Sequence, residues 1–257
     1  MSKAVFLGVD IGSLSTDAVI VDRDGRILAS AILPTGARAA RAAERARDQV
    51  LAQAGAESAA RTVATGYGRS LVHFSDKAVT EISCHARGIH QLLPAVRTLI
   101  DVGGQDSKAI RLGDNGRVMD FAMNDKCAAG TGRFLEVMAR ALEVPLEEMG
   151  ARALRSAHAV EISSMCTVFA ESEVVTRIAE GCEVDDVLAG IHRAIASRTA
   201  SLVKRVRPKP PMGMSGGVAH NPGVVAALEE ATGQTLAIPD EPQIVGALGA
   251  ALLASEL

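Results

Sequence analysis

Aromatic residues are almost absent from this sequence. They make up 2% of its 257 residues, with one tyrosine and no tryptophan. Stacking of nucleic-acid bases on aromatic rings is therefore not expected. The net charge of -3 also provides no basic face for a phosphate backbone. These features exclude the nucleic-acid-binding classes and predict a globular protein whose core is built from Ala, Val, Leu and Ile.

Long apolar runs are also missing. No stretch reaches the roughly 18 uncharged apolar residues of a membrane span, and the run at residues 4–9 is too short for a signal peptide. We therefore expect a cytoplasmic protein without a membrane partner. The four cysteines, Cys84, Cys127, Cys166 and Cys182, are widely spaced and form no C-x-x-C motif, so a zinc finger is not indicated. In a reducing compartment they are expected to be free, metal-binding or redox-active rather than disulfide-bonded.

The order of the predicted elements indicates an internal repeat. Apolar strands at 4–9 and 98–102 each end at an Asp-x-Gly sequence, that of Asp10 and that of Asp101. Two more strands follow each of them before the first helix. The predicted strands are 4–9, 15–21, 26–33, 61–65, 98–102, 107–112, 117–123 and 212–215, and the predicted helices are 38–54, 76–93 and stretches that begin near 134, 167 and 222.

A duplication of this size predicts an α/β protein with two similar domains that face each other across a cleft. The first domain is expected to span 1–94 together with a C-terminal helix at 242–257, and the second to span 95–241. In this arrangement the two Asp-x-Gly turns lie opposite each other. The basic stretch at 193–209 is expected late in a helix, where cations suit the helix dipole.

The two Asp-x-Gly turns suit nucleotide chemistry. A glycine beside an acidic residue lets backbone N–H groups approach phosphate oxygens, and the carboxylate can hold Mg²⁺ through water. Asp10 and Asp101 are the candidate magnesium carboxylates and, with Gln105, the candidate catalytic residues. The candidate phosphate-binding residues are Gly12, Ser13, Leu14, Ser15, Gly103, Gly104, Gln105 and Asp106. A single Asp-x-Gly is common in ordinary turns, so the prediction depends on the pair.

Two of the four cysteines precede helices. Cys127 lies just before the amphipathic helix near Phe134, and Cys166 precedes the helical stretch after 167. A helix N-terminus lowers the pKa of a thiol, although either cysteine alone fits a small buried residue. A four-iron cluster needs four thiolates, supplied by one chain or by two chains together. Cys84 and Cys182 lack the helix-start context, so we favour a [4Fe-4S] cluster shared by a homodimer through Cys127 and Cys166.

Six stretches resemble one known family, the ATP-dependent activators of 2-hydroxyacyl-CoA dehydratases and the related ATP-binding subunits of benzoyl-CoA reductase. They are residues 64–69, 101–106, 124–136, 166–173, 215–221 and 246–251. The resemblance runs almost from end to end. The motifs around Cys127 and Cys166 are highly specific, whereas the glycine pairs occur throughout the superfamily of sugar kinases, actin and heat-shock chaperone ATPases.

The resemblance implies a duplicated ribonuclease-H-like, actin-like ATPase fold, with ATP or ADP and Mg²⁺ in the cleft and one [4Fe-4S] cluster bridging two subunits through Cys127 and Cys166. It also implies a set of nucleotide-binding residues: Gly130, Thr131, Gly132 and Glu136 approach the nucleotide, and Gly216, Gly217 and Asn221 lie near the adenosine, with Ala219 a further candidate. The sequence departs from the family in one place, because Asp17 stands where the family often carries Lys.

The implied function is ATP-driven, low-potential electron transfer to a 2-hydroxyacyl-CoA dehydratase or a benzoyl-CoA reductase, with ferredoxin or flavodoxin as donor. Two other classes share the fold. A small-molecule kinase would use a catalytic carboxylate in the cleft and no iron, and a filament-forming or chaperone ATPase would give the thiols no role. The histidines His85, His90, His158, His192 and His220 show no metal-ligand spacing and are interpreted as surface or structural residues.

Overall fold

The computed structural model describes residues 4–125, 128–163 and 167–257. The strands are β1 Phe6–Ile11, β2 Ser15–Val21, β3 Ile27–Pro34, β4 Arg61–Thr65, β5 Lys77–Ala78, β6 Thr98–Val102, β7 Ser107–Leu112, β8 Val118–Asn124, β9 Met212–Ser215 and β10 Leu236–Ala237. The helices are α1 Ala39–Ala54, α2 Glu81–Leu92, α3 Gly132–Ala141, α4 Met149–Ala153, α5 Thr167–Ala179, α6 Val184–Arg205, α7 Pro222–Thr232 and α8 Val245–Ser255.

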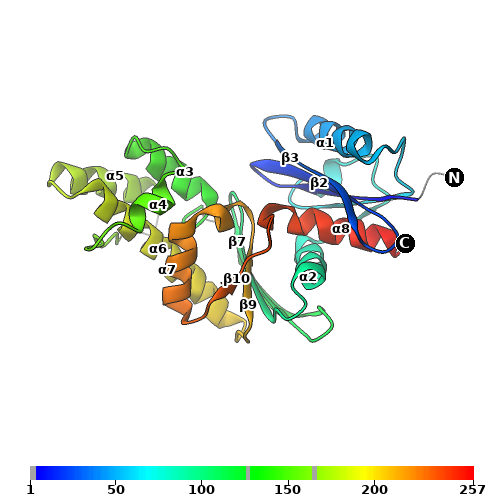
Figure 1. Ribbon diagram of the computed structural model, residues 1–257. Helices are drawn as coiled ribbons and strands as arrows, with labels where there is room; N and C mark the ends of the chain where they lie inside the picture. Colours follow the sequence, from blue (N-terminus) through cyan, green and yellow to red (C-terminus); the bar gives the residue numbers. More distant parts are fainter. Residues whose placement is uncertain (1–3, 126–127, 164–166) are drawn as a thin grey trace.

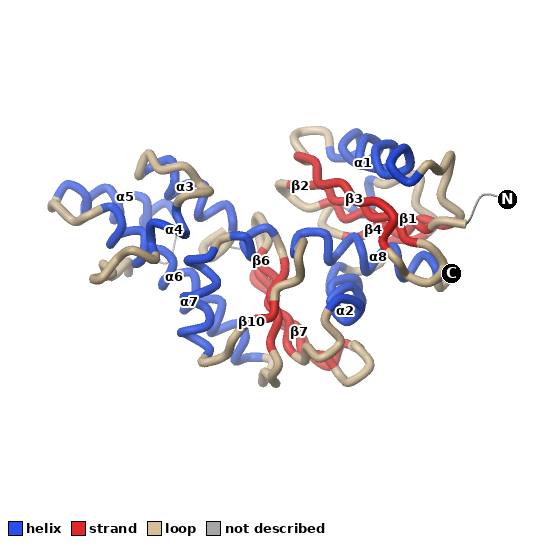
Figure 2. The backbone as a smooth tube through the Cα atoms, viewed as in Figure 1, coloured by secondary structure: helices blue, strands red, loops and turns tan. Residues whose placement is uncertain are grey.

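The described strands form two five-stranded sheets of the same topology (Figure 2). Their strand orders are β3-β2-β1-β4-β5 and β10-β9-β6-β7-β8. In each sheet the first three strands of the chain pair antiparallel and the other two pair parallel. This repetition confirms the predicted α/β class and the duplicated ribonuclease-H-like fold. β1 and β6 are buried along their whole lengths, as continuous apolar runs predict for central strands.

Helices α8 and α2 lie between the two sheets (Figure 1). α8 packs against β1, β2 and β4, and α2 packs against α8. Ile82 and Ile89 of α2 join a second apolar cluster with Leu99 of β6 and Ile110 of β7. α1 covers the outer face of the first sheet, while α6 and α7 cover that of the second. Because α8 completes the packing of the first sheet, we propose the domain limits expected from the sequence, 1–94 with 242–257, and 95–241.

Two predicted helix limits are wrong. The helix expected at 76–93 begins at Glu81, because Lys77 and Ala78 pair with β4 and the Thr80 side chain then caps the helix by accepting a hydrogen bond from the Ser83 backbone N–H. The basic stretch 193–209 is only partly helical, because α6 ends at Arg205. By contrast, α7 starts as expected, with Asn221 as its N-cap and Pro222 in its first turn. No described helix is long and apolar enough to cross a membrane.

The contact between α2 and α8 depends on glycine. A Cβ atom on Gly249 would overlap the carbonyl oxygen of Cys84. We therefore expect Gly249→Ala to lower the free energy of unfolding by about 2 to 3 kcal/mol, because the helices must move apart. Urea unfolding measures this change. In the control Gly113→Ala, the new methyl group meets mainly the flexible Met119 side chain, and equal losses in both variants would contradict the prediction.

Candidate nucleotide site

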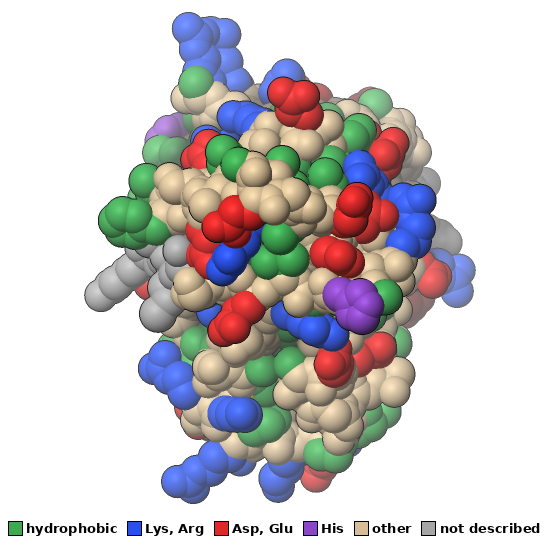
Figure 3. All heavy atoms as spheres, turned by 90° about the vertical axis from the view of Figure 1, so that its left-hand side faces the viewer, with side chains coloured by type: hydrophobic (Ala, Val, Ile, Leu, Met, Phe, Trp, Pro, Cys, Tyr) green, Lys and Arg blue, Asp and Glu red, His purple; other side chains and the backbone are tan. Residues whose placement is uncertain are grey.

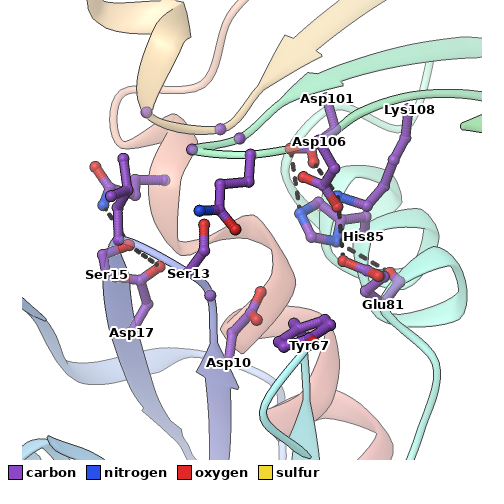
Figure 4. A pocket seen from close by; sticks show the side chains of 18 of the residues that line it. Asp10, Ser13, Ser15, Asp17, Tyr67, Glu81, His85, Asp101, Asp106 and Lys108 are labelled. Carbon is purple, nitrogen blue, oxygen red and sulfur yellow. Dashed lines mark hydrogen bonds and ion pairs between the residues drawn. The ribbon is translucent and has the colours of Figure 1, made fainter. Parts of the chain in front are cut away.

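A cavity of about 340 Å³ lies between the two sheets, where β1 and β6 end (Figure 4). This volume is typical of ligand-binding clefts. Most of the predicted site residues line it: Asp10, Gly12, Ser13, Leu14, Ser15, Asp101, Gly103, Gly104, Gln105, Asp106, Gly216 and Gly217. The two Asp-x-Gly turns therefore contribute to one cavity, which is the arrangement that the repeat predicts.

Asp101 occupies the centre of a buried network of ion pairs. Its Oδ1 accepts a hydrogen bond from Ser215 Oγ at 2.7 Å and lies 3.2 Å from His85 Nε2. Its Oδ2 lies 3.1 Å from Lys108 Nζ. Burial disfavours the charge of this carboxylate, but the positive charges of His85 and Lys108 outweigh it and hold the pKa of Asp101 well below its usual range. Both oxygens of Asp101 are thus engaged by side chains of the protein.

Lys108 contacts three carboxylates at once. Besides Asp101, its Nζ lies 3.1 Å from Glu81 Oε2 and 2.8 Å from Asp106 Oδ2. Burial alone lowers the pKa of a lysine, but these carboxylates raise the pKa of Lys108 above its usual value. Glu81 comes from α2, whereas Lys108 and Asp101 come from the second sheet. The network therefore joins the two halves of the chain.

His85 also bridges the halves, and the sequence pattern did not assign it to the site. Its Nδ1 lies 3.0 Å from the carbonyl oxygen of Glu81, and its Nε2 faces Asp101. Burial lowers the pKa of an imidazole, but Asp101 raises the pKa of His85 to a net value of about 9, so the ring is protonated at neutral pH. The available signal was the i, i+4 spacing of Glu81 and His85, which places both on one face of a helix.

The first half of the chain has an acidic residue where the second half has Lys108. Asp101 lies directly opposite Lys108 in the β6–β7 pair, and Asp10 lies directly opposite Asp17 in the β1–β2 pair. Burial raises the pKa of Asp10 to about 6 against the lowering effect of His85 and Lys108. Burial, reinforced by the charge of Asp10, raises the pKa of Asp17 to about 8. Two carboxylates in the first half thus face each other without an ammonium group between them.

The glycine turn at 130–132 lies behind the cavity rather than in its lining. The Gly132 N–H donates to the Gly103 carbonyl oxygen at 2.9 Å, and the Arg133 N–H donates to that of Gly104 at 2.8 Å. Thr131 Oγ1 donates to the carbonyl oxygen of Ala128. The first turn of α3 is therefore bonded to the loop that lines the cavity, and it extends toward the segment that carries the first cysteine motif.

Three other predicted nucleotide-binding residues also lie outside the lining of this cavity. Glu136 pairs with Arg133 at 2.9 Å on the surface of α3. Ala219 is buried. The Asn221 side chain caps α7 and lies 3.1 Å from His192 Nε2.

Cys127 and Cys166 lie outside the residues that the structure describes. Cys84 is buried, and burial raises the pKa of its thiol to about 12, which disfavours a thiolate ligand. Within 4–125, 128–163 and 167–257, no group of three or more His, Cys, Asp and Glu side chains is arranged to hold a metal ion. The His, Cys, Asp and Glu side chains in this part of the chain thus offer no ready-made cluster of three ligands for a cation.

The model of the BadF/BadG/BcrA/BcrD ATPase family matches residues 7–254. The activator of lactoyl-CoA dehydratase from Anaerotignum propionicum is 47% identical over 253 residues, which cover 97% of each protein. The structure of (R)-2-hydroxyglutaryl-CoA dehydratase component A from Acidaminococcus fermentans superimposes with a TM-score of 0.94 at 44% identity, over 98% of each chain. The activator of 2-hydroxyisocaproyl-CoA dehydratase from Clostridium difficile, solved with bound ADPNP, gives a TM-score of 0.92 at 44% identity, over 98% of this chain and 94% of that one.

Proposed function

Because this chain belongs to the BadF/BadG/BcrA/BcrD ATPase family, we propose that it is an ATP-dependent activator of a 2-hydroxyacyl-CoA dehydratase or of a benzoyl-CoA reductase. It couples ATP hydrolysis to one-electron transfer at low potential, and a cytoplasmic ferredoxin or flavodoxin donates the electron. The observation that carries this proposal is the near-full-length similarity to dehydratase activators, in a chain that has both cysteine motifs.

The nucleotide phosphates bind at the two turns after Asp10 and Asp101 in this proposal. Glycine supports it, because a Cβ on Gly104 would lie 2.6 Å from the Leu14 side chain and one on Gly103 would lie 2.7 Å from Asp106. Only glycine therefore fits at these two positions without moving a neighbouring side chain, as expected of a loop that packs closely beside a bound anion. Mg²⁺ is held through water by Asp10 and Asp101, whose hard oxygen atoms suit this ion.

The chemical step assigned to the chain is hydrolysis of the terminal phosphate. Asp10, whose pKa is about 6, is ionised at neutral pH and would orient an attacking water through the cation that it holds. Gln105 lines the same cavity and orients that water in this scheme. Asp101 holds His85 and Lys108 in place, so its role is to position charge around the phosphates.

Cys127 and Cys166 from two subunits hold one [4Fe-4S] cluster in this proposal, and the cluster stores the electron that is transferred. The surface of α5 supports a homodimer. Val168 and Phe169, in the turn after Cys166, are 67% and 68% exposed. Figure 3 looks onto the side of the molecule that carries α3 and α5, where hydrophobic side chains lie between charged ones. A second subunit would bury this apolar surface.

The hydrogen bonds from α3 to the second phosphate loop offer a route for coupling. Gly132 and Arg133 donate to carbonyl oxygens in the loop that contacts the phosphates in this proposal. A shift of that loop when ATP is hydrolysed would move the start of α3 and, with it, the segment that leads to Cys127. The two-state element is then α3 and the loop bonded to it.

The test of the proposed function is iron and activity in cysteine variants. Anaerobically purified protein is expected to be brown, with about four irons per dimer. Cys127→Ser and Cys166→Ser should each lose the iron, whereas the control Cys182→Ser should keep it, since Cys182 lies beside Gly181 at the end of α5. ATP-dependent reduction of a dehydratase partner is then measured. Iron-free protein from iron-replete anaerobic cells that phosphorylates a small molecule would contradict the proposal and favour the kinase.

A further inference from the structure

We propose that Asp10 and Asp17 together bind a divalent cation directly, at the position where the second half of the chain holds the ammonium group of Lys108. This cation is additional to the one that accompanies the nucleotide. The inference rests on the proposed function only in that nucleotide phosphates complete the ligand shell.

The register of the two sheets supplies the first argument. Each sheet begins with an antiparallel pair in which an aspartate at the end of the first strand faces one residue of the second strand. In the second sheet that residue is Lys108, and its Nζ lies 3.1 Å from the facing Asp101. In the first sheet it is Asp17, facing Asp10. The repeat thus pairs a carboxylate with an ammonium group in one half and places two carboxyl groups at the same position in the other half.

The second argument is an unsatisfied atom. Asp17 is 5% exposed, and its Oδ1 has no hydrogen-bond partner among the residues that the structure describes. Its Oδ2 accepts a hydrogen bond from Ser15 Oγ at 3.1 Å, and Ser15 Oγ in turn accepts one from Gln243 Nε2 at 2.9 Å. The side chain, which belongs to the lining of the cavity, is therefore held in place with one buried oxygen that receives no hydrogen bond. A buried carboxylate oxygen that accepts no hydrogen bond costs free energy, and a bound cation would offset that cost.

The basic groups that line this cavity are already engaged. The Lys108 ammonium group contacts Asp101, Asp106 and Glu81, and the His85 ring lies between Asp101 and the Glu81 carbonyl oxygen. Neither is left to neutralise Asp17.

The geometry suits one shared ion. Directly opposite residues of an antiparallel pair have Cβ atoms about 5 Å apart, so two aspartates can place an oxygen each on one cation. Asp10 is fixed for this role, because Gly66 and Gly246 lie so close to its carboxylate that a Cβ on either would overlap it. Two carboxylates completed by phosphate oxygens and water form the shell that Mg²⁺ prefers. No third acidic, His or Cys ligand is described there, which disfavours soft metals.

Mn²⁺ is the probe that tests this site, because free Mn²⁺ can be counted by electron paramagnetic resonance. The oxidised, cluster-containing dimer is titrated with Mn²⁺ alone. Wild type is expected to bind one ion per chain, and Asp17→Asn to weaken that binding by roughly tenfold or more, since a charged ligand is lost. Asp24→Asn, in an exposed turn between β2 and β3, is the matched control and should bind as wild type does.

Asp17→Lys gives a second measurement. Its ammonium group should occupy the cation position, so the variant is expected to bind ADP in the presence of chelator at least about tenfold more tightly than wild type does. With ADP and Mn²⁺ together it should hold one ion per chain fewer. Equal Mn²⁺ titrations of wild type and Asp17→Asn would overturn the inference. Its failure is separable from that of the proposed function, which is judged by iron content and electron transfer.

Discussion

Replacement of Lys108 by methionine is expected to lower the free energy of unfolding by about 3 to 5 kcal/mol, because it leaves buried carboxylates without their counter-charge. Lys108 is 3% exposed and lies within 3.1 Å of carboxylate oxygens of Glu81, Asp101 and Asp106. Methionine has a volume similar to that of lysine and can fill the same space, so the loss of unfolding free energy reports the removal of the charge. Urea unfolding at neutral pH under anaerobic conditions measures it.

The control for this variant removes the same charge from the surface. Lys204→Met lies in the exposed last turn of α6 and should change the free energy of unfolding by less than about 0.5 kcal/mol. Adding Asp101→Asn and Asp106→Asn to Lys108→Met should restore part of the stability, since a neutral set needs no ammonium group. A loss below about 1 kcal/mol for Lys108→Met alone would show that the network is not tightly coupled.

Lys108→Met is also expected to lower the rate of nucleotide hydrolysis. The decrease should exceed what the smaller fraction of folded protein accounts for. Lys108 and His85 connect α2 to the second sheet, so they set how the two Asp-x-Gly turns face each other. An enzyme that relies on positioning loses rate when the reacting groups shift by about 1 Å. The functional role of the network therefore follows from its place between the halves of the chain rather than from contact with phosphate.

The sequence predicted the strands, and the placement of both Asp-x-Gly turns at one cavity, for a physical reason. Each turn is a local feature, an apolar strand followed by Asp-x-Gly. Because the pattern occurs twice, it predicts two similar domains whose turns face each other. The helix expected at 76–93 shows where local reasoning fails. Its first residues are compatible with a helix, but Lys77 and Ala78 pair with β4 instead, and the helix pattern of 76–93 contains no sign of this pairing.

The residues that the sequence did not assign to the site take part in long-range contacts. His85 belongs to α2, and its partner Asp101 lies on β6. Lys108 can be assigned to the site only when the pairing of β7 with β6 is known, because that register places it opposite Asp101. The turn at 130–132 is expected at the nucleotide, and in the structure the N–H groups of Gly132 and Arg133 bond to the Gly103 and Gly104 carbonyl oxygens. These hydrogen bonds connect the turn to the loop that lines the cavity, and its contact with the nucleotide stays a prediction.

The sequence shows Asp17 only as a departure from the family pattern. The structure shows that it lies opposite Asp10 in the β1–β2 pair. The consequence for stability has a definite sign. The folded-state pKa of Asp17 is about 8, above the ordinary aspartate value of 3.8, because the residue is buried beside Asp10. The folded chain therefore binds a proton that the unfolded chain releases, so this contribution to stability is present below about pH 4 and is lost as the pH rises to about 8.

The variant Asp17→Asn, measured in chelator, is expected to be more stable than wild type at pH 8.5 by on the order of 6 kcal/mol, since the pKa of Asp17 rises from 3.8 to about 8 at about 1.4 kcal/mol per pKa unit. Below pH 4 the two should unfold with nearly equal free energies, because asparagine mimics the protonated acid and still accepts the Ser15 hydrogen bond. Comparing variant with wild type at each pH cancels the other titrating groups. Asp24→Asn should show no such pH-dependent gain, and Mg²⁺ should raise the stability of wild type at pH 8.5 but not that of Asp17→Asn. A difference between Asp17→Asn and wild type that stays constant from pH 4 to 8.5 would show that Asp17 is not held as a buried, unpaired acid.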